Sequence, residues 1–527
     1  MNLTDLHKQI MDKIDILIPI TVFILTFIVY IKFLAPSVLQ GDSAEFCIAS
    51  YTLGIPHPTG YPIYTWIGHL FSLMPIGSVA YRINLMSAFF AAFTSALIYV
   101  IVFEIAKFNK NIISNKKEQS NLPESHYKLQ INVYRVIALI AALALAFSKS
   151  FWLQAEIAEV YTLNAFFIAL MILILIKWSE NENIRLLYIF FLVYGLSLGA
   201  HASNILFMPI FLLFIGWTNY RVFLNYKNSS LFVLLFLMGL SQYIYILIRA
   251  SQFPQYSVIS PGIDEWWMLI IAKQYSYYLI FSLSSIPERI LIYFGHLKAN
   301  FFIMGYILGV IGIIGLINKN IKLAMLLIVM FILNIIFYLN YYVFDVEFMF
   351  IPSFLIFSIF IGVGVITAFD LIKYILDKVE GKTKSKNIKR NILKILIIFI
   401  LASSLVMVPI TSYINNYNQI EQQDGDSFEY FVSTTLNEVP SNSTIITYWK
   451  AFTAFKYFQI VEGINSNVTV IPVEDDDVLK VVDQYSDKQN VFLVHNLDQI
   501  SGEYYLITFW NVPDAGTMYR IIKINKI

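Results

Sequence analysis

Long apolar runs recur along most of this chain of 527 residues. A helix that crosses the hydrocarbon core of a bilayer needs roughly 20 mostly apolar residues. Eleven runs meet or approach this length, near residues 16–34, 83–105, 134–148, 160–177, 186–199, 203–217, 230–249, 301–317, 322–340, 349–370 and 392–412. The sequence therefore predicts an α-helical polytopic membrane protein with about eleven spans. The runs 186–199 and 203–217 would form either a tight hairpin or one merged pair.

The composition excludes several soluble classes of protein. Hydrophobic residues make up 58% of the chain and charged residues 13%, whereas an average soluble chain is about half apolar and about a quarter charged. The 36 Lys and Arg residues nearly balance the 35 Asp and Glu residues, so the formal net charge is +1 and no field attracts nucleic acid. Cys47 is the only cysteine, which excludes an intrachain disulfide and a zinc site built from cysteine pairs.

The basic residues predict the orientation in the membrane, because cytoplasmic loops are rich in Lys and Arg. Two loops carry clusters of them: 106–135, with Lys107, Lys110, Lys116, Lys117, Lys128 and Arg135, and 371–391, with Lys373, Lys378, Lys382, Lys384, Lys386, Lys389 and Arg390. With eleven spans, the N-terminus then lies in the cytoplasm and everything after residue 412 lies outside. We expect a bacterial inner membrane, with the outer part periplasmic or extracellular.

The sequence pattern changes after residue 412. Residues 413–527 have mixed polarity, with β-rich runs at 443–449, 468–473, 490–496, 504–509 and 518–524 and helical candidates at 427–438, 451–463 and 475–485. Alternating strands and helices predict a small α/β domain on the outer face. We therefore expect two domains: a transmembrane domain over 1–412 and an outer α/β domain over 413–527.

Two carboxylates and a histidine follow the first span. In Gly41-Asp42-Ser43-Ala44-Glu45-Phe46 the spacing places Asp42 and Glu45 on one face of a helix, where they could share a base role or hold a cation. The alternative is a simple N-capping box. Three prolines and two glycines within residues 54–62 then restrict the backbone around His57 to a non-helical conformation. Such a conformation is costly at membrane depth unless it lines a cavity, so the segment favours a functional site.

Other ionisable residues fall on the same predicted face, where such groups are costly and more often functional than decorative. They include Glu156, Glu159, His201 and Asp345. Arg82 and Arg249 lie at the outer ends of their spans. A guanidinium there can donate two parallel hydrogen bonds to a phosphate. The alternative for both arginines is snorkelling to the membrane interface.

Several segments carry a resemblance to a known family. The first is GDSAEFCIASYTLGIPHPTGYPIYTWIGHLFSLMP at 41–75, followed by YRINLMSAFFAA at 81–92, FWLQAEIAEVYTLNAFF at 151–167, GLSLGAHASNILFMP at 195–209, YIYILIRA at 243–250, KQYSYYL at 273–279 and NYYVFDVEFMFIPS at 340–353. They resemble a family of multispanning membrane proteins long described as a domain of unknown function. That family is similar to the protein O-mannosyltransferases of the glycosyltransferase-C superfamily. The resemblance covers about residues 25–355.

The resemblance implies a polytopic enzyme with a polyprenyl-phosphate sugar as donor and an acidic residue of the first outer loop as base. Asp42 matches the leading aspartate of the first motif and Glu45 its glutamate. Superfamily motifs often place the two acids adjacent or one apart, whereas here they are three apart. The family often has Asn before the histidine at 201, where this chain has Ala200.

We therefore expect an inverting glycosyltransferase that moves a sugar, with mannose as a candidate, to a hydroxyl of a protein, glycan or lipid on the outer face. Asp42 and Glu45 would be catalytic. The substrate contacts would be His57, Arg82, Glu156, Glu159, Tyr161, His201, Arg249, Tyr275 and Asp345. No cofactor or metal site is predicted, and metal dependence stays open. The alternatives are a lipid-linked saccharide transporter or flippase, which predicts charged pairs deep in the spans, and a membrane scaffold that does not depend on Asp42.

Overall fold

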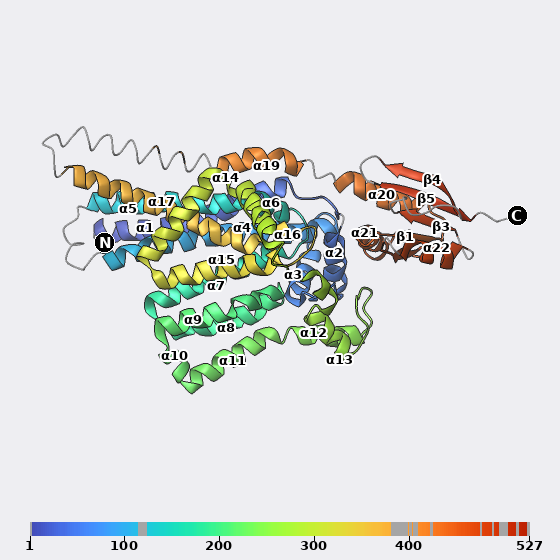
Figure 1. Ribbon diagram of the computed structural model, residues 1–527, viewed down its shortest axis with the longest axis horizontal. Helices are drawn as coiled ribbons and strands as arrows, with labels where there is room; N and C mark the ends of the chain where they lie inside the picture. Colours follow the sequence, from blue (N-terminus) through green and yellow to red (C-terminus); the bar gives the residue numbers. More distant parts are fainter. Residues whose placement is uncertain are drawn as a thin grey trace.

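The computed structural model contains a bundle of long helices with a small sheet beyond one of its ends (Figure 1). The structure describes residues 3–39, 41–113, 124–380, 409–421, 425–474, 477–486, 490–494, 504–512 and 516–523, together with positions 399 and 403. The long helices are α1 (Leu3–Lys32), α4 (Val79–Ile113), α5 (Glu124–Ala146), α7 (Tyr161–Asn181), α14 (Ile286–Lys319), α15 (Ile321–Leu339) and α17 (Ile351–Glu380). Shorter helices extend the bundle: α8 (Ile184–Leu198), α9 (Met208–Asn219), α10 (Arg221–Leu224), α11 (Tyr226–Leu240) and α12 (Tyr243–Ser251).

The membrane spans predicted from apolar runs are helical wherever the structure describes them. Within those residues eight helices are long and apolar enough to cross a bilayer, and a ninth span results if α5 and α6 (Lys149–Ala155), bent by 69°, count as one. The runs 186–199 and 203–217 form separate helices, so they are not merged. The eleventh run, 392–412, lies almost wholly outside the described residues. The chain is thus an integral membrane protein, with a span count close to the one expected.

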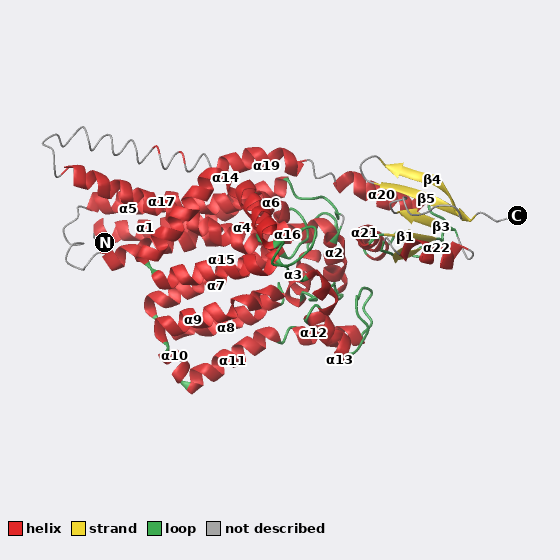
Figure 2. Ribbon diagram, viewed as in Figure 1, coloured by secondary structure: helices red, strands yellow, loops and turns green. Residues whose placement is uncertain are grey.

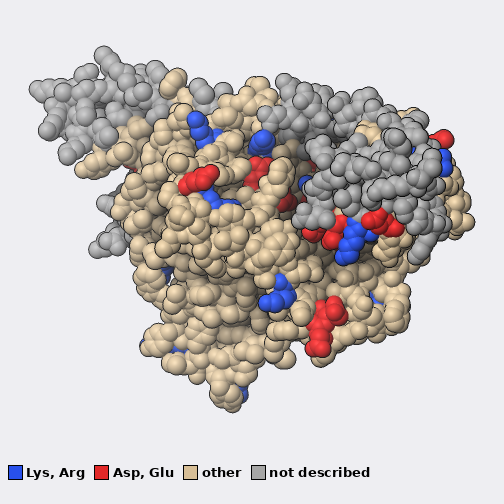
Figure 3. Space-filling model, turned by 45° about the vertical axis from the view of Figure 1, so that its right-hand side comes forward, with Lys and Arg blue, Asp and Glu red and all other residues tan. Residues whose placement is uncertain are grey.

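The outer surface of the bundle suits a lipid environment. Large apolar side chains of α1, such as Ile16, Leu17 and Ile28, are more than half exposed. On the face drawn in Figure 3, most of the described surface carries neither basic nor acidic side chains. Inside the bundle, glycines let helix backbones approach closely, because a Cβ at Gly312 of α14 would meet the carbonyl oxygen of Phe360 at 1.8 Å.

The C-terminal part forms the small α/β unit that the alternating pattern predicts (Figure 2). It consists of α20 (Gly425–Glu438), β1 (Thr444–Thr447), α21 (Trp449–Ile460), β2 (Thr469–Pro472), α22 (Val478–Ser486), β3 (Val491–Val494), β4 (Tyr504–Val512) and β5 (Gly516–Lys523). The strand order is β2-β1-β3-β5-β4. Strand β1 runs parallel to β2 and β3, whereas β5 is antiparallel to β3 and β4.

Short helices and turns occupy the end of the bundle nearest the sheet (Figure 1). They are α2 (Asp42–Thr52), α3 (Pro62–Ser72), α6, η2 (Ala202–Phe207), α13 (Ile263–Ile270), η3 (Lys273–Tyr278) and α16 (Val346–Met349). Helix α19 (Thr411–Glu421) packs on α6, since the rings of Trp152 and Tyr413 stack 5.3 Å apart. The domain boundary at 412/413 stays a prediction.

Candidate active site

Helix α2 begins at Asp42 because the residue before it is a glycine. Gly41 has a φ of 102°, which side-chain-bearing residues rarely adopt. Gly41 is also the N-cap residue, and no side chain caps the helix. The N-capping box considered for Asp42, Ser43 and Glu45 is therefore not formed. Both carboxylates are left for other contacts.

The proline-rich turn 54–62 is held against the loop that follows α12. The backbone N–H of Ile55 donates to the oxygen of Tyr256, and the N–H of Val258 donates back to Ile55, each at 3.1 Å. Gly54 is required here, since a Cβ would lie 2.5 Å from the carbonyl oxygen of Tyr256. These contacts fix the turn that carries His57.

The centre of the site is a line of three side chains: Asp42, His57 and Glu45. Nδ1 of His57 lies 2.5 Å from Oε2 of Glu45, and Nε2 of the same ring lies 3.8 Å from Oδ2 of Asp42. Glu45 is fully buried, and its Oε1 also accepts from the backbone N–H of His57 and from the hydroxyl of Tyr256, both at 2.9 Å. The side chain of Asp42 is 38% exposed. Glu45 thus orients the imidazole, while Asp42 is the carboxylate that a substrate can reach.

The two carboxylates decide the charge of the imidazole. Burial alone would lower the pKa of His57, but the charges of Asp42 and Glu45, together with the hydrogen bond to Glu45, raise it to about 9. His57 therefore carries a positive charge at neutral pH. The site holds a cation between two acids in a largely buried setting.

Aromatic and imidazole rings lie around this line. Ring centroids of Tyr61 and Tyr275 lie 5.2 Å and 6.2 Å from that of His57. The ring of His201 lies 6.2 Å from both Tyr61 and Tyr161. Burial, and then the charge of His57, lower the pKa of His201 to about 4, so this imidazole is neutral. The site therefore offers neutral hydrogen-bonding groups next to a charged centre.

Two more acids approach the centre from other elements. Burial, and then the charges of Asp42 and Asp345, raise the pKa of Glu159 well above its usual value. Burial and Asp42 raise the pKa of Asp345 as well. Glu159 therefore holds a proton more readily than an exposed carboxyl does, and in its protonated form it can donate a hydrogen bond to a sugar hydroxyl.

Three sequence-predicted residues have other partners in the structure. Arg249 donates to the carbonyl oxygens of Thr52 and Leu53 at 2.9 Å and 2.8 Å, which closes the C-terminal end of α2. Arg82 likewise donates to carbonyl oxygens of the turn after α3, at Ser72, Met74 and Ser78. Burial raises the pKa of Glu156 to about 10, and its backbone oxygen accepts from Ala35. The substrate contacts expected of these residues stay predictions.

Sequence reasoning missed three residues of the site. Tyr61 lies inside the proline-rich motif, so its position could have been inferred. Tyr256 and Lys450 lie in segments with no motif, and only the fold brings them here. Tyr256 donates to Glu45, and the charge of Lys450 acts on Asp345.

The same centre could hold a cation. Ligand-type atoms of Asp42, Glu45 and His57 lie within 4.8 Å of one another. Nδ1 of His57 already faces Glu45 at hydrogen-bond distance, so a metal ion bound there would compete with a protonated imidazole.

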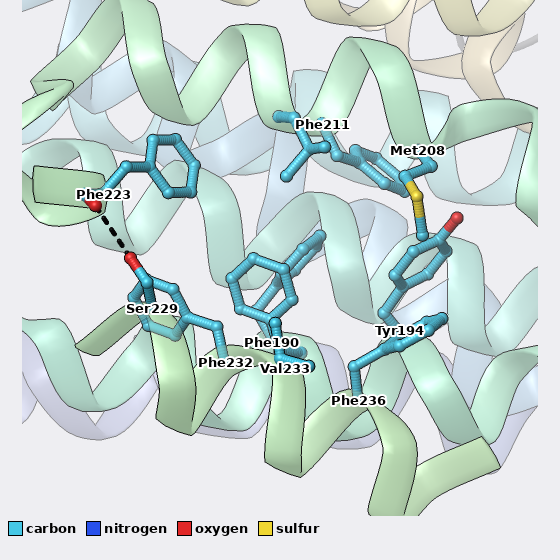
Figure 4. Close-up of a pocket in the computed structure, with 11 residues that line it drawn as sticks. Phe190, Tyr194, Met208, Phe211, Phe223, Ser229, Phe232, Val233 and Phe236 are labelled. Carbon is cyan, nitrogen blue, oxygen red and sulfur yellow. Dashed lines mark hydrogen bonds between the residues drawn. The ribbon is translucent and has the colours of Figure 1, made fainter. Parts of the chain in front are cut away.

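An apolar cavity of about 230 Å³ lies between α8, α9 and α11. Figure 4 shows Phe190, Tyr194, Phe211, Phe232 and Phe236 around it. The wall is almost wholly apolar, so the cavity suits a hydrocarbon chain.

Comparisons with known proteins agree with the fold and with the first motif. Residues 42–223 match the model of the protein O-mannosyl-transferase TMEM260 N-terminal domain. A solved structure, ArnT from Cupriavidus metallidurans bound to undecaprenyl phosphate, superposes with a TM-score of 0.54 at 10% identity over 95% of this chain and 97% of ArnT. The fold is of the glycosyltransferase-C type. The match to the domain model begins at Asp42 and includes His57, Glu159 and His201.

Two curated relatives carry the same family name. The chain is 28% identical to protein O-mannosyl-transferase TMEM260 of Mus musculus over 241 residues, which cover 44% of this chain and 30% of the mouse protein. It is 23% identical to the Dictyostelium discoideum protein of that name over 520 residues, covering 88% of this chain and 58% of the relative. The chain thus spans less than two thirds of either relative. It is a membrane protein similar to protein O-mannosyltransferases.

Proposed function

We propose that the protein is an inverting glycosyltransferase that moves a sugar from a polyprenyl-phosphate donor to an acceptor hydroxyl. The observation that carries this proposal is the partly exposed carboxylate of Asp42, held 3.8 Å from an imidazole that buried Glu45 fixes in place. The arrangement supplies a base with access to substrate and a cation beside it. Both are needed when a hydroxyl displaces a phosphate.

In the proposed reaction the acceptor oxygen attacks the anomeric carbon while Asp42 takes the hydroxyl proton. The bond between that carbon and the phosphate oxygen breaks, and the electron pair leaves with the lipid phosphate. Because this is a single displacement, the configuration at the anomeric carbon inverts. The imidazolium of His57 stabilises negative charge on the leaving phosphate.

The surrounding residues would bind the sugar. The hydroxyl groups of Tyr161 and Tyr275, and Glu159 in its protonated form, can donate to sugar oxygens. Neutral His201 can accept or donate. Asp345 would hold a further hydroxyl on the side nearest the C-terminal α/β unit. These assignments rest on the grouping of the residues around His57.

Two arguments favour a lipid-linked donor. The relatives are named protein O-mannosyl-transferases, and the ArnT structure holds undecaprenyl phosphate, so mannose and a polyprenyl phosphate are the first candidates and a protein hydroxyl the first acceptor. In addition, nucleotide sugars are made in the cytoplasm, whereas the loop charges predict that the site faces outward. A hydrocarbon tail could lie in the apolar cavity between α8, α9 and α11.

The decisive experiment is transfer by the purified full chain from synthetic polyprenyl-phosphate mannose to acceptor peptides, with no nucleotide sugar present. Product with an inverted anomeric centre supports the proposal. Transfer from a nucleotide sugar alone would overturn it. A transporter would instead move the labelled lipid across proteoliposomes without forming product, and a scaffold would do neither.

The outward orientation is also a proposal, with a bacterial inner membrane as the expected location. It predicts that an impermeant thiol reagent labels a cysteine at Ser441 on intact cells but not one at Asn181. The structure decides this choice of positions: both residues are exposed, whereas neighbouring Ser443 is buried. Native Cys47 is buried and adds no background. Labelling at Asn181 with none at Ser441 would reverse the orientation.

A further inference from the structure

The C-terminal α/β unit reaches the start of α2 through one helix. Both backbone groups of Gly41 bond to α21: its N–H donates to the carbonyl oxygen of Lys450 at 3.3 Å, and its own oxygen accepts from Oγ1 of Thr453 at 2.9 Å. Thr453 is fully buried. The residue immediately before Asp42 is therefore clamped by a segment more than 400 positions away.

Helix α21 is anchored to the bundle at a second point. The hydroxyl of Tyr457 accepts from the backbone N–H of Ala80 at 3.1 Å, near the start of α4, and donates to Glu462 at 2.8 Å. The apolar side chains of α21, among them Ala454 and Phe458, belong to the same continuous core as those of α2. Helix α21 is thus a fixed support for the clamp.

The same helix also touches the loop that carries Asp345. Nζ of Lys450 lies 5.2 Å from the ring centroid of Phe344, the residue before Asp345. One turn of α21 therefore contacts the chain on both sides of the candidate site, at Gly41 and at Phe344.

The clamp matters because, among the residues that the structure describes, no side chain caps the first turn of α2. Gly41 combines a positive φ with the absence of a capping side chain. A glycine in this position leaves the direction of the next residue open unless its peptide groups are bonded. The hydroxyl of Thr453 and the carbonyl of Lys450 supply those bonds.

We propose that Thr453 is a positioning residue for the candidate base: its hydroxyl fixes the Gly41 peptide and so directs the carboxylate of Asp42. This inference rests on the proposed function and assigns the C-terminal α/β unit a part in the transfer reaction. The unit completes the site from outside the bundle.

The test is Thr453→Val in the full chain, which keeps the shape of the side chain and removes the hydroxyl. Misdirection of the base should lower kcat by about 10-fold to about 100-fold, while the donor KM changes by less than about twofold because the loss is confined to the transition state. Thr453→Ser keeps the hydroxyl and should restore turnover. Hydrogen–deuterium exchange should become faster in Thr453→Val at the amides of 42–47.

Thr447→Val is the matched control. Thr447 is equally buried in the same unit, and its hydroxyl donates to the oxygen of Val494 within the sheet at 3.1 Å. This variant should keep wild-type kcat and wild-type exchange at 42–47. An equal loss in both valine variants would trace the effect to the fold of the unit and overturn the inference.

Wild-type turnover and wild-type exchange in Thr453→Val would overturn it too. If the wild-type protein transfers no sugar from any lipid-linked donor, the proposed function fails. The exchange data then test by themselves whether Thr453 holds the Gly41 peptide. Faster exchange at 42–47 in Thr453→Val supports the clamp, and exchange equal to that of the wild type refutes it.

Discussion

Acidic residues at the two ends of the helix bundle differ in their partners. At the end away from the sheet, Glu104 lies between Lys107 and Lys177, with O–N distances of 2.8 Å and 2.6 Å. Asp15 and Asp370 likewise pair with basic side chains there. At the end nearest the sheet, Asp42 and Glu45 share the single imidazole of His57.

This difference distinguishes acids that are paired one by one with basic side chains from acids that are grouped at the candidate site. The charge of an acid that meets a lysine or arginine at short range is balanced by its partner. Removing one partner of such a pair is destabilising, and the paired acid has little capacity left for chemistry. Acids that crowd around one another change their proton affinities instead, and such groups cluster at functional sites. The raised pKa values of His57 and Glu159 reflect this grouping of charges together with burial.

The strongest test of the comparison is Asp42→Asn. The amide keeps the volume of the side chain but takes no proton at neutral pH, so transfer should fall by about 10²-fold to about 10⁴-fold. The measurement is turnover of a synthetic polyprenyl-phosphate sugar by purified protein. Glu45→Gln should lose less, because Glu45 acts through His57 and not on the acceptor. Near wild-type turnover in Asp42→Asn would end the proposed mechanism.

Arg249→Ala tests the end of the bundle nearest the sheet, with a smaller expected effect than Asp42→Asn. If the guanidinium leaves the carbonyl oxygens of Thr52 and Leu53 to hold the donor phosphate, the donor KM should rise several-fold while the acceptor KM stays constant. Arg221→Ala, an exposed arginine at the opposite end, is the control and should change neither constant. A fall in kcat with both KM values unchanged would show that Arg249 only holds the end of α2.

Glu104→Gln tests the opposite end. Removing one partner of a buried ion pair is strongly destabilising, but the two lysines here are about one-third exposed, which weakens the effect. The free energy of unfolding should therefore fall by about 1–3 kcal/mol. The thermal unfolding midpoint of the purified protein should fall by a few degrees, while kcat per folded molecule is unchanged. Loss of turnover without loss of stability would contradict the division between the two ends.

The sequence predicts the spans well because a bilayer imposes long apolar runs, and each run shows in the sequence alone. The sequence also makes Asp42, Glu45 and His57 candidates for one site, since they lie within a few turns of chain. The sequence cannot predict the separate role of each of these residues. Burial under Tyr256 makes Glu45 the partner of His57, and that burial depends on a loop some 200 residues away.

The proposed contribution of the C-terminal α/β unit cannot be predicted from the sequence either. Thr453 and Lys450 carry no pattern that links them to Gly41, because a hydrogen bond to a backbone oxygen needs only a hydroxyl at the right place. Arg82 and Arg249 show the reverse: their positions at span ends suggest phosphate binding, whereas in the structure their donors meet carbonyl oxygens at helix ends.

The smallest expected effect is a pH dependence of stability. The pKa of His57 rises from its ordinary value of 6.5 to about 9 in the folded protein. A group with a raised folded-state pKa stabilises the protein fully below its unfolded pKa, and this contribution is lost as pH rises through the folded pKa. In buffer with a chelator, the unfolding midpoint should therefore fall between about pH 6.5 and about pH 9.

His57→Gln should remove most of that slope, because the glutamine gains no proton from the two carboxylates. His69→Gln is the matched control, since Nδ1 of His69 contacts only the carbonyl oxygen of Ser50 among the described residues, and it should keep the wild-type slope. The two variants separate a cation held between acids from an ordinary helix histidine. Equal slopes in wild type and His57→Gln would mean that His57 is neutral in the folded protein, and the charged centre that distinguishes this end of the bundle would have to be placed elsewhere.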